Sequence, residues 1–131
     1  MGVEIATERR RVLVSDDEPD FAKATKLYFE GEGYEVRATT SAGETLDWAR
    51  SWQPHVITTD VFKPGQMDGL EMTRRLKADD RTRDIPVIVA SANGGQEDGR
   101  RKALDAGACA VLAKPLDLKD LLRLVQEALR E

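Results

Sequence analysis

An α/β fold with a parallel sheet is predicted by three observations in the sequence. Short apolar runs alternate five times with amphipathic segments, four of these runs are rich in Val and Ile, and charged residues directly follow three of them. Strands that are each followed by a helix imply a parallel sheet with right-handed crossovers and helices on both faces. The strand-like runs are residues 12–14, 34–39, 56–59, 86–90 and 110–113.

The first predicted helix lies between the first two strands. Pro19 is near its start, where the missing backbone N–H does no harm. Phe21, Ala24 and Tyr28 have the spacing of one helical face, and we expect this face to be the buried one. Gly31, followed by a second glycine two residues later, is expected to end the helix.

Helical signals recur after the second, third and fifth strands. Ser41 and Glu44 form a capping-box pattern at the start of the second helix. The third helix is expected over residues 69–78. The last helix carries a regular apolar stripe of Leu118, Leu121, Leu122, Val125 and Leu129.

The segment after the fourth strand differs from the other helical segments because it is rich in glycine. Gly94 and Gly95 precede the expected helix, and Gly99 lies inside it. A glycine inside a helix costs up to about 1 kcal/mol relative to alanine. We therefore expect this fourth helix to be the least rigid one, and a switch needs an element with two states of similar energy.

Length and composition indicate one ordinary globular domain. The chain has 131 residues, 40% of them hydrophobic, and residues 1–9 read as a short polar tail. A net charge of −4 argues against binding to nucleic acid or to a membrane surface, and no apolar run approaches membrane-spanning length. Cys109 is the only cysteine, so no internal disulfide can form, and a cytoplasmic location is expected.

Acidic and basic residues stand at the ends of three apolar runs. Asp16 and Asp17 follow the first run, Asp60 follows the third, and Lys114 follows the fifth. The carboxyl ends of neighbouring parallel strands share one crevice, which is where open α/β sheets bind ligands. Carboxylates that are packed together repel one another, so this cluster needs a cation to stay ionised. The pattern indicates a hard divalent metal, an aspartate nucleophile and a phosphate group.

Asp60 is the candidate nucleophile, since a carboxylate can attack phosphorus and hold the phosphoryl group as a mixed anhydride. Mg²⁺ prefers oxygen ligands, and it offsets the repulsion between the two anions that react. Asp17 and Asp60 would supply carboxylate oxygens and Phe62 a backbone carbonyl oxygen. Asp16 would act through water or as a further ligand.

Two more side chains complete the predicted site. Lys114 offers a point charge to Asp60 or to a phosphoryl oxygen. Ser91, at the end of the fourth strand, offers a hydroxyl group to another phosphoryl oxygen. Read alone, Ser91 is a turn or capping residue, and it gains a role only together with the other side chains.

The set of motifs resembles the receiver domain of bacterial two-component response regulators. The motifs follow the order of that family at close to its spacing, across nearly the whole chain, and we therefore expect residues 1–131 to form a single receiver domain. They are Asp16-Asp17-Glu18, Asp60-Val61, Pro64, Met67-Asp68-Gly69-Leu70, Ile85-Pro86-Val87-Ile88, Ser91-Ala92, Gly107-Ala108 and Lys114-Pro115.

The resemblance implies a (βα)5 flavodoxin-like fold and Mg²⁺-dependent transfer of a phosphoryl group to Asp60. The donor would be a sensor histidine kinase or a histidine phosphotransfer protein. It also implies a cis bond between Lys114 and Pro115 and a Ser91 hydroxyl that responds to the phosphoryl group. The recipient of the signal would be a downstream target protein or an output domain. The protein would promote its own phosphorylation and dephosphorylation without being a turnover enzyme.

One position departs from the family pattern. Family members commonly have Tyr or Phe three residues before the lysine, and this chain has Val111 there, so the usual aromatic rotamer switch cannot operate. The expected output surface is the fourth and fifth helices with the strand between them, which is also a candidate homodimer surface. Phe62 and Asn93 occupy positions that tune dephosphorylation in the family, and bulky Phe62 is expected to slow it.

Three alternative functions fit the sequence less well. A phosphohydrolase with an aspartate nucleophile usually has a second Asp two residues later, where this chain has Phe62. A flavin carrier of the same fold needs a phosphate-binding loop after the first strand, and Asp16 and Asp17 would repel a phosphate there. A receiver that is never phosphorylated and acts only by docking is disfavoured because the acidic and basic residues are all present.

Overall fold

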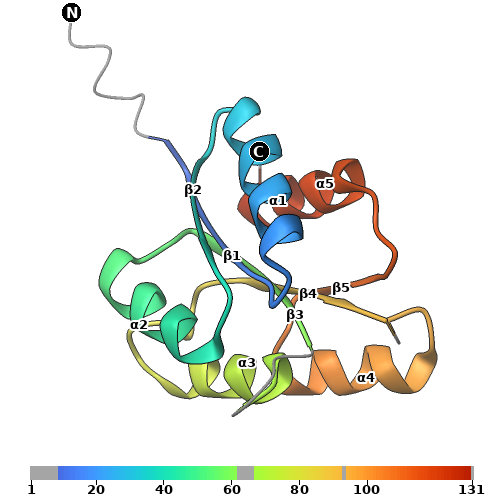
Figure 1. Cartoon of the computed structure of the whole chain (residues 1–131). Helices are drawn as coiled ribbons and strands as arrows, with labels where there is room; N and C mark the ends of the chain where they lie inside the picture. The colour runs from blue at the N-terminus through green and yellow to red at the C-terminus, as the bar shows by residue number, and fades with distance from the viewer. Residues whose placement is uncertain (1–8, 62–66, 93, 131) are drawn as a thin grey trace, which may run out of the picture.

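The structure is a computed structural model, and it describes residues 9–61, 67–92 and 94–130. Strands and helices alternate along the chain from the first strand to the last helix (Figure 1). The strands are β1 (Arg11–Ser15), β2 (Glu35–Thr39), β3 (Val56–Asp60), β4 (Val87–Ser91) and β5 (Ala110–Ala113). The helices are α1 (Pro19–Gly31), α2 (Ala42–Trp52), α3 (Gly69–Ala78), α4 (Glu97–Ala106) and α5 (Leu118–Leu129).

All five strands are parallel and form one sheet in the order β2-β1-β3-β4-β5. Helices α1 and α5 cover one face of this sheet, and α2, α3 and α4 cover the other (Figure 1). The predicted (βα)5 flavodoxin-like fold, doubly wound with helices on both faces, is thereby confirmed. The predicted tail, residues 1–9, lies outside the described residues except for its last position.

Side chains of successive strand residues enter opposite cores, as the pleat of a strand requires. In β1, Val12 and Val14 belong to the core under α1 and α5, and Leu13 belongs to the core under α2, α3 and α4. In β4, Ile88 enters the first core, while the residues on either side of it enter the second. Both cores exclude water, so the sheet holds the ends of its strands at fixed positions.

Local signals fix most helix ends where the sequence predicts them. Pro19 occupies the first turn of α1, and the Ser41 side chain accepts a hydrogen bond from the Glu44 N–H at the start of α2. Asp68 caps α3 in the same way by accepting from the Glu71 N–H at 2.9 Å.

The buried face of α1 differs from the predicted one. Ala22, Thr25 and Phe29 are buried, whereas Ala24 is exposed and Phe21 and Tyr28 lie at the edges of the buried face. The prediction placed the helix about one residue out of phase because it followed two aromatic residues of intermediate exposure. Phe29 fixes the actual phase by packing against the Tyr34 ring, with 5.7 Å between ring centroids.

Gly69 sits where the start of α3 touches the end of β3. Its N–H donates to the Val61 carbonyl at 2.7 Å, and a Cβ at this position would collide with the Asp60 backbone carbonyl oxygen. Gly43, inside α2, has nothing within 4 Å of the place where a Cβ would lie. The absent side chain of Gly69 therefore lets α3 approach the strand end that carries Asp60.

We expect Gly69→Ala to destabilise the fold by about 1–3 kcal/mol, because backbone atoms must move to admit the new methyl group. Chemical denaturation measures this change. Gly43→Ala is the matched control, and it should be neutral or stabilising by up to about 1 kcal/mol. Equal stability of the two variants would contradict the close approach of α3 to β3.

Candidate functional site

Asp60 is the last residue of β3 and lies at the carboxyl end of the sheet, between β1 and β4. It is 2% exposed, and register places it beside Ala90 of β4. The Thr59 hydroxyl donates to the Asp60 backbone carbonyl at 2.8 Å. Together with Gly69, this hydrogen bond holds the backbone under the Asp60 carboxylate.

Asp16 and Asp17 follow β1 directly, and their backbone hydrogen bonds hold them beside Asp60. The Asp16 N–H donates to the Thr39 carbonyl at 3.0 Å and so continues the ladder between β1 and β2. The Asp17 N–H donates to Asp60 Oδ2 at 3.2 Å. The Asp16 carboxylate accepts from the Glu18 N–H at 2.9 Å, which tightens the turn into α1.

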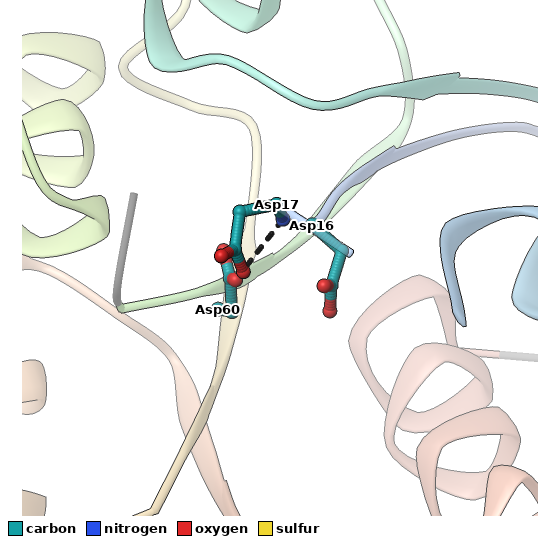
Figure 2. A group of neighbouring side chains, drawn as sticks. All are labelled: Asp16, Asp17 and Asp60. Atoms are coloured by element: carbon teal, nitrogen blue, oxygen red, sulfur yellow. Dashed lines mark hydrogen bonds between the residues drawn. The ribbon is translucent and has the colours of Figure 1, made fainter. Parts of the chain in front are cut away.

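Three carboxyl groups therefore meet in one cup. One carboxylate oxygen from each of Asp16, Asp17 and Asp60 lies within 4.8 Å of the other two. Figure 2 shows the Asp17 and Asp60 side chains close together, with Asp16 on the other side of the Asp17 backbone. Asp16 and Asp60 are buried, and Asp17 is partly open to solvent. The cup is thus closed at its floor and open at one rim.

The closeness of these groups changes the protonation of Asp17. A hydrogen bond between the Asp17 and Asp60 side chains, partial desolvation, and repulsion from Asp60 and Asp16 raise the pKa of Asp17 to about 6. A pKa raised this far means that too little positive charge lies near the Asp17 carboxylate to stabilise its ionised form. Three oxygen donors in this state fit the preference of Mg²⁺ for carboxylate ligands.

Lys114 brings the basic group to the same end of the sheet. Its Nζ lies 3.8 Å from Asp16 Oδ2, and its backbone N–H donates to the Ser91 carbonyl at 2.9 Å. The peptide bond between Lys114 and Pro115 is cis. Ser91 is buried at the end of β4, in register with Ala113. Strands β1, β3, β4 and β5 thus each contribute to one site.

Phe21 is a member of this site that the sequence analysis missed. Its ring lies 5.9 Å from Lys114 Nζ, within the range of a cation–π contact. The sequence could have indicated this position, because Phe21 follows Asp17 by only four residues and lies in the first turn of α1, next to the loop that carries the acidic residues. Phe21 and Lys114 also line an open hollow of about 470 Å³ together with Glu18, Ala92, Pro115 and Leu116.

Three positions from the sequence analysis lie beside or beyond this geometry. Val111 is 9% exposed and belongs to the core under α2, α3 and α4. Phe62 and Asn93 lie outside the described residues, so the structure places neither the Phe62 carbonyl nor the Asn93 side chain.

A second hollow leads from the site toward α4. It has a volume of about 220 Å³ and opens beside Ser91 and Val61. Gln96, Asp98, Gly99 and Lys102 line its other wall. The only buried residues of α4 within the described chain are Ala103 and Ala106, so this helix is anchored by small side chains.

Within the part of the chain that the structure describes, we find no helix with the length and apolar character needed to span a bilayer. The sequence model of the response regulator receiver domain matches residues 12–126. This match contains all of the residues of the acidic cup as well as Lys114.

Curated relatives agree with this match. The DNA-binding dual master transcriptional regulator RpaA of Synechocystis is 33% identical over 120 residues, which are 92% of this chain and 49% of that protein. Response regulator PleD of Caulobacter vibrioides is 37% identical over 107 residues, 82% of this chain and 23% of that protein. The chain therefore spans half or less of the length of these two relatives.

Solved structures agree as well. A response regulator receiver domain protein from Methanospirillum hungatei has a TM-score of 0.85 at 28% identity, covering 94% of this chain and 95% of that one. The receiver domain of sensor histidine kinase PA1611 from Pseudomonas aeruginosa holds a magnesium ion in its active-site cleft. It has a TM-score of 0.83 at 27% identity, covering 95% of this chain and 100% of that one. Sequence match, relatives and structures lead to one conclusion: the chain belongs to the response regulator receiver domains of two-component signalling systems.

Proposed function

We propose that this receiver domain accepts a phosphoryl group on Asp60 in a reaction that depends on Mg²⁺, and thereby switches a protein-interaction surface. The observation that carries this proposal is the acidic cup, in which oxygens of Asp16, Asp17 and Asp60 lie within 4.8 Å of one another. Receiver domains are signalling modules, and the proposed reaction uses the protein as an acceptor that is modified. We assign it to the cytoplasm.

In the proposed step, an Asp60 carboxylate oxygen attacks the phosphorus of a phosphohistidine. The new O–P bond gives an aspartyl phosphate, the N–P bond breaks, and the imidazole nitrogen leaves with its electron pair and takes up a proton. Lys114 would pair with a phosphoryl oxygen, and the Ser91 hydroxyl would donate to another. The burial of Asp60 and Ser91 keeps water away from these contacts.

Asp17 and Asp60, with Asp16 directly or through water, would hold the metal ion. When bound, Mg²⁺ would neutralise the negative charge that accumulates as two anions approach each other. The Phe62 carbonyl remains the proposed further ligand from the sequence. The raised pKa of Asp17 supports the assignment, because a cation in the cup would allow all three carboxylates to ionise.

The open hollow beside Lys114 supports docking of the phosphodonor. Its lining is largely apolar, with Phe21, Pro115 and Leu116 around the Lys114 stem. A sensor histidine kinase or a histidine phosphotransfer protein must bring an imidazole ring to the rim of the cup, and an apolar hollow at that rim suits a helix that carries such a ring.

For output, we propose that the signal passes from Ser91 to α4. Val111 is buried and too small to act as an aromatic rotamer switch, whereas the hollow of about 220 Å³ connects Ser91 to the first turns of α4. A Ser91 hydroxyl drawn toward the phosphoryl group would alter the wall against which α4 rests. The α4–β5–α5 surface would then bind a target protein or an output domain, and its use as a homodimer surface stays a prediction.

The central test is phosphorylation by a small phosphodonor such as acetyl phosphate, read by intact mass. We expect one phosphate adduct on the wild-type chain with Mg²⁺, and none with a chelator or on Asp60→Asn. Asp105→Asn removes an exposed carboxylate on α4 and should keep the adduct. An adduct on Asp60→Asn, or an equal yield without metal, would show that the chemistry lies elsewhere.

A second test concerns the repulsion in the cup. Asp17→Asn removes one of three crowded carboxylates, so without metal it should melt at a higher temperature than the wild type at pH 7. Added Mg²⁺ should raise the melting temperature of the wild type and of Asp105→Asn, but that of Asp17→Asn much less. The same rise in all three would remove Asp17 from the metal site.

The Mg²⁺ response should also depend on pH. Because the pKa of Asp17 is about 6 in the metal-free fold and 3.8 ordinarily, the fold binds more protons than the unfolded chain between these values. The contribution of Asp17 to the stability of the metal-free protein therefore falls as the pH rises through this window. Mg²⁺ replaces the proton, so the rise in melting temperature should be small near pH 4 and should reach a plateau above pH 6. A response that is flat with pH in thermal melts would contradict this coupling.

A further inference from the structure

Strand β2 forms one edge of the described sheet, and its outer side lies between α1 and α2 (Figure 1). A hollow of about 430 Å³ runs along it. The floor is formed by residues 35–38 of β2, one wall by Lys26 of α1, and the other by Glu44 and Trp48 of α2. An open strand edge at the floor of a groove is a place where another strand can add.

The hydrogen-bonding phase of β2 is fixed by its partner β1. The Glu35 N–H donates to the Arg10 carbonyl, and the Thr39 carbonyl accepts from the Asp16 N–H, both at 3.0 Å. In a parallel ladder, alternate residues bond to the same neighbour. Val36 and Ala38 therefore direct their backbone N–H and C=O groups away from β1, into the groove.

The charges on β2 select one way of pairing with a second, antiparallel copy of the strand. With a two-fold axis at Val36, the Val36 residues of the two copies exchange backbone hydrogen bonds. Glu35 of each copy then lies opposite Arg37 of the other, which gives two pairs of opposite charge. A shift of the axis to residue 37 would set Arg37 against Arg37, and a shift to residue 35 would set Glu35 against Glu35. Only the register centred on Val36 pairs opposite charges.

Arg37 is held in position for this contact. Its guanidinium lies 4.3 Å from the centroid of the Trp48 ring and 5.2 Å from that of Trp52, on the face of the sheet that α2 covers. The two indole rings are in edge contact, with 6.3 Å between their centroids. A long side chain that is already ordered loses less conformational entropy when it forms an ion pair.

We propose that two copies of this chain associate through antiparallel pairing of β2, with Val36 at the axis and ion pairs between Glu35 and Arg37. The pairing joins the two sheets edge to edge. It leaves the acidic cup and the α4–β5–α5 surface of each copy uncovered, because these lie at the strand ends and at the opposite edge of the sheet. Association through β2 is thus compatible with phosphorylation and with output in the same assembly.

The test is sedimentation equilibrium of the full chain over a concentration series up to about 1 mM, which detects a dimer whose dissociation constant is about 1 mM or lower. We expect the wild type to dimerise, more weakly at high salt. Arg37→Glu and Glu35→Arg should each weaken dimerisation about tenfold or more, because each sets like charges opposite one another. An equimolar mixture of the two variants should form a heterodimer, and the double variant Glu35→Arg/Arg37→Glu should dimerise like the wild type.

Two further variants keep the result specific. Ala38→Pro removes an outward N–H without a change in charge, and proline is tolerated on the open side of an edge strand, so it should give a folded monomer. Arg101→Glu makes the same charge change as Arg37→Glu but on α4, and it should leave dimerisation unaltered. A wild type that stays monomeric at all concentrations overturns the proposal, even if it binds an extended peptide. The proposal is also overturned if the mixture of Arg37→Glu and Glu35→Arg stays monomeric. The same holds if Arg101→Glu abolishes the dimer while Arg37→Glu does not. Phosphorylation of Asp60 is measured separately on each variant, so neither result determines the other.

Discussion

Mutual repulsion among three carboxylates organises the functional end of this protein. Backbone hydrogen bonds and strand register hold Asp16, Asp17 and Asp60 together. Their carboxylates repel one another, and this repulsion contributes to the raised pKa of Asp17. A protein keeps such a cluster only if the two cores on either side of the sheet hold the strand ends in place. The electrostatic cost of this repulsion would be relieved by a bound cation, and this relief underlies the proposed binding of Mg²⁺ and, through it, of a phosphoryl group.

The elements around the cup divide into rigid and weakly anchored ones. Helix α5 and strand β4 bury large apolar side chains, and α3 contacts the end of β3 through Gly69. By contrast, α4 is anchored by two alanines and is separated from Ser91 by a hollow. This contrast favours α4 as the element that responds to a change at Asp60, because little packing has to be lost when it moves.

The two edges of the sheet also differ in character. The β5 edge adjoins α4 and α5, close to Lys114 and Ser91, whereas the β2 edge carries the Glu35 and Arg37 pair next to two tryptophans. Separate edges would let one molecule bind its own copy and an output partner simultaneously. The strand order places the β2 edge and the α4–β5–α5 surface at opposite edges of the sheet, so that a partner bound at one would not cover the other.

The sequence by itself determined the fold class, the five strands and the residues of the cup. Strand and helix signals are local, and residues at the carboxyl ends of parallel strands must converge wherever the strands are neighbours. Only the tertiary structure decided the phase of α1, the approach of Gly69 to Asp60, the contact between Phe21 and Lys114, and the stacking of Arg37 on two indole rings. Each of these depends on how the helices pack against the sheet. That packing brings together residues that are far apart in the chain, and no local sequence pattern predicts it.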